Sequence, residues 1–458
     1  MSLGVPQTGV LVSTSLRRHL GPSHPSKHSL RQCQVSTPNE VVRLVWRLVK
    51  KRRNQMGAVV DLGAGHCQFA YAGVYDKYIG VEVDVRKKPE IPLTQGAKII
   101  HADVLDITGS FDLAIGNPPY TRHHLIGKRW RKHAREVIAA ETNYDVSEFA
   151  NLYLYFVWLA ILRTKPDGLV ALIIPYEWVS RPSATSLRDF LREKGYRVDV
   201  YRFDEKARVF SKVKTTACIT LIDKRAAQHE FNCWKFHNGE AIASSITRGS
   251  EGVIAYENGT KDARAFRGLS PGSQNVFLLT EQQRLKAKIP RPAVVPCISS
   301  LRALNQKIVV LNDAAFKQHY VETGRKCWLV KTQPPLHPKI RQHLYKAPKK
   351  IMTNWTCRNR KPWYRFDLPP IPDIIYASGF RGTAPRVVVN AIKARVSGSS
   401  HGIVLPAGSD RTVVVRYIRG FPFADRVVAH ANGLMKVEVR QMNSVLKSYL
   451  ARANGDVK

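Results

Sequence analysis

Short apolar runs alternate with glycine turns and polar segments in the first half of the chain. Four runs of strand type lie at residues 58–62, 78–81, 97–100 and 113–115, and the first continues through a glycine turn into a helix. Such alternation is typical of an α/β sheet built largely from parallel strands. We therefore expect the carboxyl ends of these strands to meet at one edge of the sheet, where ligands bind in folds of this type.

Two helices are expected around these strands. Residues 41–49 carry apolar side chains on one face, and Thr37, Pro38 and Glu40 precede them with the spacing of a capping box. Residues 149–162 are nearly all apolar, which predicts a helix buried against the sheet and too short to cross a membrane. Taken alone, the first segment is simply a capped amphipathic helix.

An acidic residue stands at the end of each of the first three strands. Asp61 precedes a glycine turn, and Glu82 follows it by 21 residues, the distance at which α/β nucleotide sites place a carboxylate on ribose hydroxyls. Asp103 follows the third strand. The turn alone is weak evidence, because the third glycine of the dinucleotide fingerprint is missing. The three acids together predict a nucleotide-binding site.

The fourth strand ends in the tetrapeptide Asn117-Pro118-Pro119-Tyr120. The two prolines cannot continue a strand ladder, so we expect a rigid loop at the carboxyl end of the strand. The loop offers an amide, an outward carbonyl and an aromatic face, which are the parts needed to grip a planar base with an exocyclic amine. A strand terminator with a packed tyrosine is the plainer interpretation, and the acids upstream favour the binding site.

The charge of the chain indicates a polyanionic partner. A formal net charge of +37 over 458 residues exceeds what solubility requires, and nucleic acid is the first candidate. An anionic membrane surface is the second, although no basic amphipathic helix stands out.

The seven cysteines show no zinc spacing and fit reduced thiols of a cytoplasmic protein. His123 and His124 lack further ligands at metal spacing, so we expect no metal, and segment 121–144 is interpreted as a solvated or phosphate-facing loop.

From about residue 35 to 225 the motifs follow one another in an order that resembles a known family. They are Ser-Thr-Pro-Asn-Glu at 36–40, Ile-Gly-Val-Glu-Val-Asp at 79–84, Ala-Asp-Val-Leu at 102–105, Gly-Asn-Pro-Pro-Tyr at 116–120 and Val-Phe-Ser-Lys at 209–212. The arrangement resembles the gamma-class, TaqI-type N6-adenine DNA methyltransferases of restriction-modification systems, which depend on S-adenosylmethionine. One departure is the pair His66-Cys67, which stands where many relatives have a further glycine.

The resemblance implies roles for individual residues. The cofactor S-adenosylmethionine would be held at its methionine, ribose and adenine parts by Thr37, Asp61, Gly63, Gly65, Glu82, Asp103 and Val104.

The catalytic loop would be Asn117, Pro118, Pro119 and Tyr120. The Asn117 side-chain oxygen and the Pro118 carbonyl would accept the two hydrogens of the target amine. Tyr120 and Phe210 would hold a flipped adenine, because an amine inside a duplex cannot reach such a loop.

The expected fold class is α/β, with a Rossmann-like methyltransferase domain and a mixed α/β target-recognition domain. The catalytic domain would span residues 36–250 and the recognition domain 251–458. Residues 1–35 lack acidic residues, which fits a basic, disordered tail or the product of an early start codon, although their composition also fits an organellar transit peptide.

In the second domain the basic aromatic segment 354–365 supplies the candidate DNA contacts Arg358, Arg360, Lys361 and Trp363. The same segment also fits cation–π packing on a surface.

The sequence therefore predicts a site-specific methyltransferase acting on the N6 amine of adenine in double-stranded DNA, in the cytoplasm and associated with the nucleoid. It would be the modification enzyme of a type II system, and a separate cognate endonuclease that acts on the same site would be a second partner. The alternatives are an RNA-base, cytosine-N4 or protein-glutamine methyltransferase, and a non-catalytic DNA-binding relic. The net charge argues against a protein substrate, and the intact acids and tetrapeptide argue against a relic.

Overall fold

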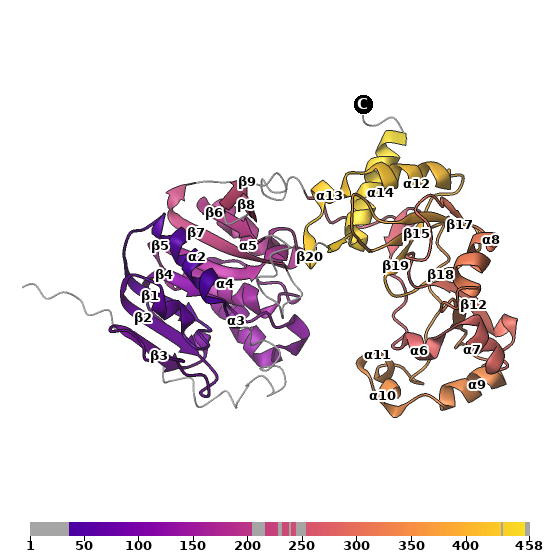
Figure 1. The fold of residues 1–458 in the computed structure, drawn as a ribbon, viewed down its shortest axis with the longest axis horizontal. Helices are drawn as coiled ribbons and strands as arrows, with labels where there is room; N and C mark the ends of the chain where they lie inside the picture. Colours follow the sequence, from indigo (N-terminus) through magenta and orange to yellow (C-terminus); the bar gives the residue numbers. More distant parts are fainter. Residues whose placement is uncertain are drawn as a thin grey trace, which may run out of the picture. The chain divides into compact units, whose positions relative to one another are not determined.

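The computed structural model describes residues 36–203, 216–227, 231–237, 240–243, 253–431 and 434–453. The chain forms two compact units (Figure 1). The first contains the residues up to Val253 together with Val428–Gly433, and the second contains Ile254–Val427 and Leu434–Lys458. Within the described residues, no helix is both long and apolar enough to cross a membrane.

The first unit is built on a mixed sheet, which in the described chain has nine strands in the order β3-β2-β1-β4-β5-β7-β6-β8-β9. The strands are β1 (Met56–Leu62), β2 (Tyr75–Glu82), β3 (Ala97–His101), β4 (Phe111–Gly116), β5 (Thr164–Pro175), β6 (Tyr196–Arg202), β7 (Ala217–Ala227), β8 (Phe231–His237) and β9 (Glu240–Ala243). Strands β1 to β5 are parallel, whereas β7 runs antiparallel to both of its neighbours, β5 and β6. The strand order reverses at β1 and β4, and a ligand crevice forms at such a point beyond the strands' carboxyl ends.

Helices cover both faces of this sheet. They are α2 (Asn39–Lys50), α3 (Lys128–Thr142), α4 (Leu152–Leu162) and α5 (Thr185–Glu193), with short 3-10 turns η1 (Gln68–Tyr71), η2 (Val104–Asp106), η3 (His123–Leu125), η4 (Tyr176–Val179) and η5 (Pro182–Ala184). Buried residues of α3, α4 and α5 belong to one apolar core, and those of α2 belong to a second core with the opposite sheet side chains. The strand β20 (Ala429–Ala431) also belongs to this unit.

Three expectations about these helices are wrong. Helix α2 begins at Asn39, which places Pro38, a residue with no side-chain acceptor, at the N-cap position, and the Thr37 hydroxyl accepts from Asn117 instead. Helix α4 begins at Leu152, and Phe149, expected to be buried, is 71% exposed. Segment 121–144, expected to be a loop, contains α3, whose buried Ala134 and Ile138 are spaced four residues apart on one helical face. Because most side chains of this segment are charged or polar, the narrow apolar face of the helix was not recognised in the sequence.

The second unit is also mixed α/β, which agrees with the expected fold class. Within its described residues it has a five-stranded sheet, β10-β19-β15-β17-β13, and a four-stranded sheet, β11-β14-β12-β18, while β16 pairs with β21. Its strands are β10 (Arg264–Phe266), β11 (Leu278–Leu279), β12 (Val294–Ile298), β13 (Val310–Leu311), β14 (Trp328–Val330), β15 (Ile374–Ala377), β16 (Gly379–Phe380), β17 (Val387–Asn390), β18 (Arg395–Val396), β19 (Ser400–Val404) and β21 (Leu434–Lys436).

The helices of the second unit are mostly short. They are α6 (Gln274–Phe277), α7 (Glu281–Lys286), α8 (Asp313–Phe316), α9 (Pro338–Tyr345), α10 (Lys349–Met352), α11 (Trp355–Arg358), α12 (Arg411–Gly420), α13 (Phe423–Arg426) and α14 (Val439–Ala453), with a 3-10 turn η7 (Arg291–Ala293) and a π turn η8 (Lys317–Val321). Helices α9 to α11 lie at one end of this unit, and α12 and α14 lie at the other (Figure 1).

Candidate active site

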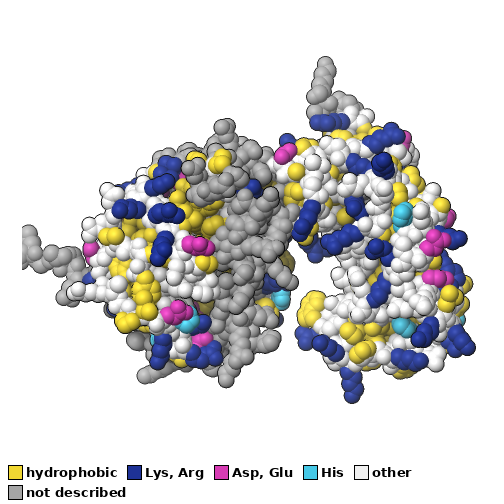
Figure 2. All heavy atoms as spheres, in the orientation of Figure 1, with side chains coloured by type: hydrophobic (Ala, Val, Ile, Leu, Met, Phe, Trp, Pro, Cys, Tyr) yellow, Lys and Arg dark blue, Asp and Glu magenta, His cyan; other side chains and the backbone are white. Residues whose placement is uncertain are grey.

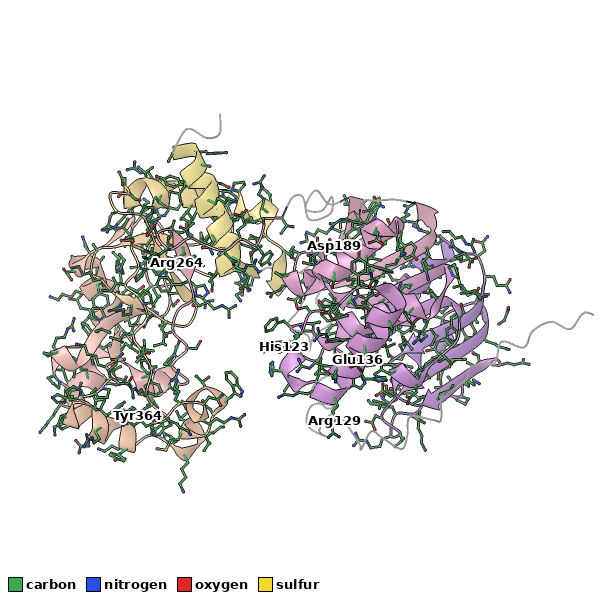
Figure 3. All side chains as sticks on the ribbon, turned by 180° about the vertical axis from the view of Figure 1, so that it is seen from behind. His123, Arg129, Glu136, Asp189, Arg264 and Tyr364 are labelled. Atoms are coloured by element: carbon green, nitrogen blue, oxygen red, sulfur yellow. The ribbon has the colours of Figure 1, made fainter. Side chains whose placement is uncertain are left out.

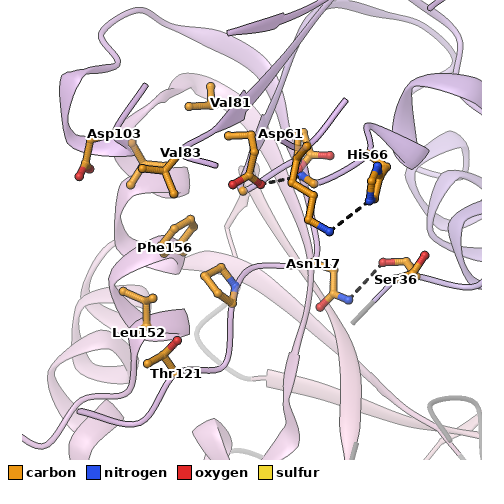
Figure 4. A pocket seen from close by; sticks show the side chains of 18 of the residues that line it. Ser36, Asp61, His66, Val81, Val83, Asp103, Asn117, Thr121, Leu152 and Phe156 are labelled. Atoms are coloured by element: carbon orange, nitrogen blue, oxygen red, sulfur yellow. Dashed lines mark hydrogen bonds between the residues drawn. The ribbon is translucent and has the colours of Figure 1, made fainter. Parts of the chain in front are cut away.

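A cavity of about 360 Å³ lies at the carboxyl ends of β1, β2 and β4 in the first unit (Figure 4). The residues predicted to bind the cofactor all line it, namely Thr37, Asp61, Gly63, Gly65, Glu82, Asp103 and Val104. Asn117 and Pro119 of the predicted catalytic loop line it as well. The structure thus brings residues from five separate chain segments into one site.

Asp61 carries a buried carboxylate with one oxygen unsatisfied. Its side chain is 1% exposed, and the Tyr78 hydroxyl donates a hydrogen bond of 2.7 Å to Oδ2. Within the described structure Oδ1 has no hydrogen-bond partner. Burial raises the pKa of Asp61 to about 7, with Tyr78 opposing the rise and the charge of Glu82 adding to it. A buried acceptor of this kind beside a cavity suits a cationic ligand group.

The glycine turn and Glu82 hold each other in place. The Gly65 amide donates to Glu82 Oε2 over 2.9 Å, and the Asp84 amide donates to Oε1 over 2.9 Å. Gly63 and Gly65 have φ of +81° and +57°, a region that favours glycine. A Cβ built on Gly65 would meet nothing within 4 Å, so the turn leaves space for a ligand. Both Glu82 oxygens retain lone pairs for hydroxyl donors.

Asp103 has a partner that the sequence did not reveal. The indole nitrogen of Trp130 donates to its two carboxylate oxygens, over 3.1 Å to Oδ1 and 2.9 Å to Oδ2, and the Leu105 amide donates to Oδ1 over 3.0 Å. Trp130 lines the cavity and packs edge-on against Tyr155, with ring centroids 5.6 Å apart. The only sequence signal for Trp130 is its position four residues before Ala134 on the apolar face of α3.

Thr37 and Asn117 are joined by a hydrogen bond. The Asn117 Nδ2 group donates to the Thr37 hydroxyl over 3.1 Å, and the Thr37 amide donates to Gln68 Oε1 over 2.9 Å. Gln68 in turn donates through Nε2 to the Ser36 hydroxyl over 2.8 Å. Because the Asn117 nitrogen is committed to Thr37, its Oδ1 atom is left as an acceptor. Gln68 was not anticipated, since nothing in its local sequence marks it.

The remaining residues of the predicted loop are fixed by the sheet. Tyr120 is half-buried, its hydroxyl donates to the Ile173 carbonyl over 2.9 Å, and burial raises its pKa well above the usual range. Its ring lies edge-on to Tyr153 at 6.1 Å. Pro118 is buried and, like Tyr120, does not line the cavity. Phe210, the second predicted base contact, lies outside the described residues.

The four predicted DNA contacts of the second unit have different environments. Arg358 and Lys361 are exposed. Arg360 donates to the carbonyls of Pro271 and Ser270 over 2.8 and 2.9 Å, with its guanidinium 5.3 Å from the Phe366 ring centroid.

Trp363 packs beside Phe277, with ring centroids 5.9 Å apart. Arg360 and Trp363 therefore have a packing role within the unit. Trp355, which belongs to the predicted segment 354–365 but was not among the four candidate contacts, is 72% exposed, and Tyr345, which lies outside that segment, is 78% exposed.

The fold and the site together define the class of protein. The strand order 3-2-1-4-5-7-6, with β7 antiparallel, and the acidic strand ends around one cavity are those of a class I methyltransferase that uses S-adenosylmethionine. Among the described residues, no cluster of three or more His, Cys, Asp or Glu side chains could hold a metal ion.

Comparison with known families identifies the chain further. Residues 80–210 match the Eco57I restriction-modification methylase, and residues 261–421 match the C-terminal domain of the type II methyltransferase M.Eco57I. Together the two segments make up more than half of the 458 residues. The chain belongs to this family of restriction-modification methylases and is a DNA methyltransferase, which confirms the resemblance at that level.

Individual relatives are distant. The type II methyltransferase M.AccI of Acinetobacter calcoaceticus is 21% identical over 96% of this chain and 89% of its own length. M.TthHB8I of Thermus thermophilus is 26% identical over 44% of this chain and 48% of its own. Among solved structures, the type IIL restriction-modification enzyme MmeI in complex with DNA has a TM-score of 0.58 at 12% identity. That similarity covers 90% of this chain and 64% of MmeI, and it concerns the fold alone.

Proposed function

We propose that the chain transfers a methyl group from S-adenosylmethionine to the N6 amine of adenine in double-stranded DNA. The observation that carries the proposal is the bond from Asn117 Nδ2 to Thr37, which leaves the Asn117 oxygen as an acceptor beside the cofactor cavity. The loop that holds Asn117 has the Asn-Pro-Pro-Tyr sequence of the adenine-methylating relatives it resembles.

The cavity fits the proposed cofactor part by part. Unpartnered Asp61 Oδ1 suits the ammonium group of the methionine, and Glu82, already held by two amides, suits the ribose hydroxyls. Asp103, held by Trp130, suits the amino group of the cofactor's adenine. When bound, S-adenosylmethionine supplies an electrophilic methyl group on a sulfonium.

The protein's part in the reaction is to make the target nitrogen a better nucleophile. The lone pair of an adenine amine is delocalised into the ring. Asn117 Oδ1 and the Pro118 carbonyl would accept its two hydrogens, which favours a tetrahedral nitrogen and stabilises the positive charge that grows on it. Fixed acceptors of this kind contribute a few kcal/mol, about 2.7–4 for a single oxyanion-hole donor. Correct alignment of the reacting atoms supplies a further large term.

The target base would have to leave the duplex to reach this loop. Flipping costs a few kcal/mol, and stacking on an aromatic ring offsets part of that cost. Tyr120 suits the role because its hydroxyl donates to the Ile173 carbonyl, which holds the far end of the ring in place. Phe210 stays a prediction for the second contact.

Substitutions at Asn117 and Thr37 test the proposed chemistry. Asn117→Ala should lower the rate of methyl transfer by a factor on the order of a hundred or more. Its binding of duplex DNA should be unchanged. Thr37→Val keeps the shape of the side chain but removes the acceptor for Asn117, so transfer should fall, whereas Thr37→Ser should retain it. Transfer is measured as label in N6-methyldeoxyadenosine, and DNA binding by fluorescence anisotropy. Equal activity of the Val and Ser variants would contradict the role given to the Thr37–Asn117 bond.

We further infer that DNA binds to a basic aromatic surface of the second unit, here termed the α9–α11 patch. It consists of the exposed residues Tyr345, Lys349, Lys350, Trp355 and Arg358. Cationic side chains beside exposed rings suit phosphates and bases. Lys and Arg side chains are present at this end of the unit in Figure 2, and Figure 3 shows the side chains from the other side.

Salt dependence tests the α9–α11 patch. Replacing Lys349 and Lys350 by Ala should weaken DNA binding and reduce the slope of log K against log salt by about 1 for each phosphate that the protein no longer neutralises. Arg416→Ala is the matched control, because Arg416 is exposed on α12 at the opposite end of the same unit. An unchanged slope in the double variant, or an equal change in the control, would place the DNA elsewhere.

We propose that a separate endonuclease recognises the same DNA sequence. The support is that the chain belongs to a restriction-modification family and resembles type II methyltransferases. DNA modified by this chain should become resistant to that nuclease, and the purified chain should leave the same DNA uncut. Cleavage by the purified chain would contradict a separate nuclease.

A further inference from the structure

Two side chains at one end of the cofactor cavity, His66 and Lys87, form a hydrogen-bonded pair. Lys87 Nζ lies 3.1 Å from His66 Nε2, and His66 Nδ1 lies 2.6 Å from the Lys88 carbonyl oxygen. A carbonyl oxygen only accepts, so Nδ1 must carry the hydrogen and donate it. Nε2 is then the acceptor, and the Lys87 ammonium donates to it. The pair fixes the position of the lysine head group.

Lys87 retains hydrogen-bonding capacity toward the cavity. An ammonium group has three donors, and His66 takes one of them. Within the described residues, Lys87 forms no ion pair with a carboxylate within 4.0 Å. Its head group is therefore free to donate to a ligand, and a negatively charged ligand group suits it best.

The charges that line the cavity complement those of S-adenosylmethionine. Among the described residues that line the cavity, four are carboxylic acids, Asp61, Glu82, Glu90 and Asp103, and Lys87 is the one lysine or arginine. The cofactor carries two positive groups, the sulfonium and the ammonium, and one negative group, the carboxylate of its methionine. Lys87 thus has one anionic counterpart on the ligand, the carboxylate of its methionine.

The position of the pair agrees with the methionine end of the cofactor. In Figure 4, His66 lies on the same side of the cavity as Ser36 and Asn117, while Asp103 lies on the opposite side. With the cofactor's adenine at Asp103 and the transfer site at Asn117, the methionine falls beside His66. His66 also follows directly on Gly65, whose amide bonds to Glu82.

We propose that Lys87, positioned by His66, binds the methionine carboxylate of S-adenosylmethionine. This gives a role to His66, which belongs to the pair His66-Cys67 that stands where many relatives have a further glycine. The inference concerns the cofactor and does not depend on which base is methylated.

Paired ligands and paired variants test the proposal in the full-length protein without DNA. Affinity is measured by titration calorimetry for S-adenosylmethionine and for its decarboxylated analogue, which keeps the sulfonium, ammonium, ribose and adenine. Lys87→Met should weaken binding of S-adenosylmethionine on the order of tenfold to a hundredfold, the usual effect of losing a charge-assisted hydrogen bond. Binding of the analogue should be unchanged, which also shows that the variant's cavity is intact.

Matched variants isolate the head group of Lys87. Lys88→Met makes the same change at the next position and should alter neither affinity. His66→Ala should weaken binding of S-adenosylmethionine several-fold but not binding of the analogue, and His66→Gln, which restores an acceptor for Lys87, should recover part of the loss. Equal weakening of both ligands by Lys87→Met would overturn the proposal. A loss of DNA affinity with unchanged cofactor affinity would overturn it too, by assigning Lys87 to a phosphate.

Discussion

At the scale of single residues, the buried carboxylate of Asp61 decides the electrostatics of the site. Burial raises its pKa to about 7, so in the free protein it is about half ionised at neutral pH. Its Oδ1 atom has no partner in the described structure, and Asp61 lines the cavity proposed to hold a cationic ligand. Only the ionised form attracts a cation by charge, so the bound ligand should draw the proton off Asp61.

The affinity for S-adenosylmethionine should therefore rise as pH increases toward and through 7. Below that value it should fall by up to about tenfold per pH unit, in proportion to the ionised fraction of Asp61. Calorimetric titrations between pH 5.5 and 7.5 check this below the range where an α-amino group loses its proton, about 7.7–8.0. Asp61→Asn should bind weakly with little pH dependence. An Asn variant that keeps the wild-type pH profile would show that another group titrates.

The sequence predicted the residues that lie at strand ends and missed those that support them. Asp61, Glu82, Asp103 and Asn117 could be found because parallel strands bring their carboxyl ends together whatever the rest of the fold does. Trp130, Gln68 and Lys87 could not. Each meets the site through the tertiary packing of a helix, turn or loop, which local sequence does not specify.

At the scale of elements, the end of β4 shows how backbone geometry serves the site. Gly116 has φ of +149°, and a Cβ built there would lie 2.3 Å from Asp61 Oδ1. The glycine lets the strand turn into the catalytic loop while the carboxylate of the neighbouring strand passes beside it. The positive φ of Gly116 and the close approach of the Asp61 carboxylate both require a residue without a side chain.

Gly116→Ala should displace the Asp61 carboxylate and strain the turn. We expect affinity for S-adenosylmethionine to fall at least tenfold and methyl transfer to be lost, because the substitution disturbs Asp61 and Asn117 together. Gly420→Ala is the control, since a Cβ there meets nothing within 4 Å and its φ is not positive. Wild-type cofactor affinity in the Gly116 variant would show that the site tolerates the added methyl group.

Sequence patterns predicted helices and strands well in segments rich in apolar residues and poorly in segments rich in charged residues. The first four strands appear at or close to their expected positions because their residues are buried. Helix α3 was missed because its apolar face is narrow among basic residues. The start of α4 was misplaced because Phe149 adds to the apolar run but lies before the helix, where the Asn151 side chain accepts from the His123 amide.

At the scale of the whole molecule, the chain is two units with separate cores. Their sequence boundary is simple except that Val428–Gly433 returns to the first unit. Val428 is 4% exposed and belongs to an apolar core of that unit. No local pattern could reveal this return, because it depends on which core the segment packs against. The net charge of +37, in contrast, needs no fold to indicate a polyanionic partner.

Thermal unfolding should resolve the two units and assign Val428 to the first. S-adenosylmethionine should raise the midpoint of one transition, because a ligand stabilises the unit that binds it. Val428→Ala should lower that same transition, at a cost of about 1–3 kcal/mol for a buried methyl-bearing side chain. Val414→Ala, in a buried core of the second unit, should lower the other. If Val428→Ala acts only on the transition that the cofactor leaves unchanged, the division proposed here is wrong.

The central claim is that this methyltransferase modifies the N6 amine of adenine in duplex DNA. Its most direct test is mass spectrometry of nucleosides after purified protein acts on duplex DNA, and in parallel on RNA, with isotopically labelled S-adenosylmethionine. We predict label in N6-methyldeoxyadenosine from duplex DNA. Label only in cytosine, in RNA or in the protein fraction, or no label in any of them, would contradict the claim.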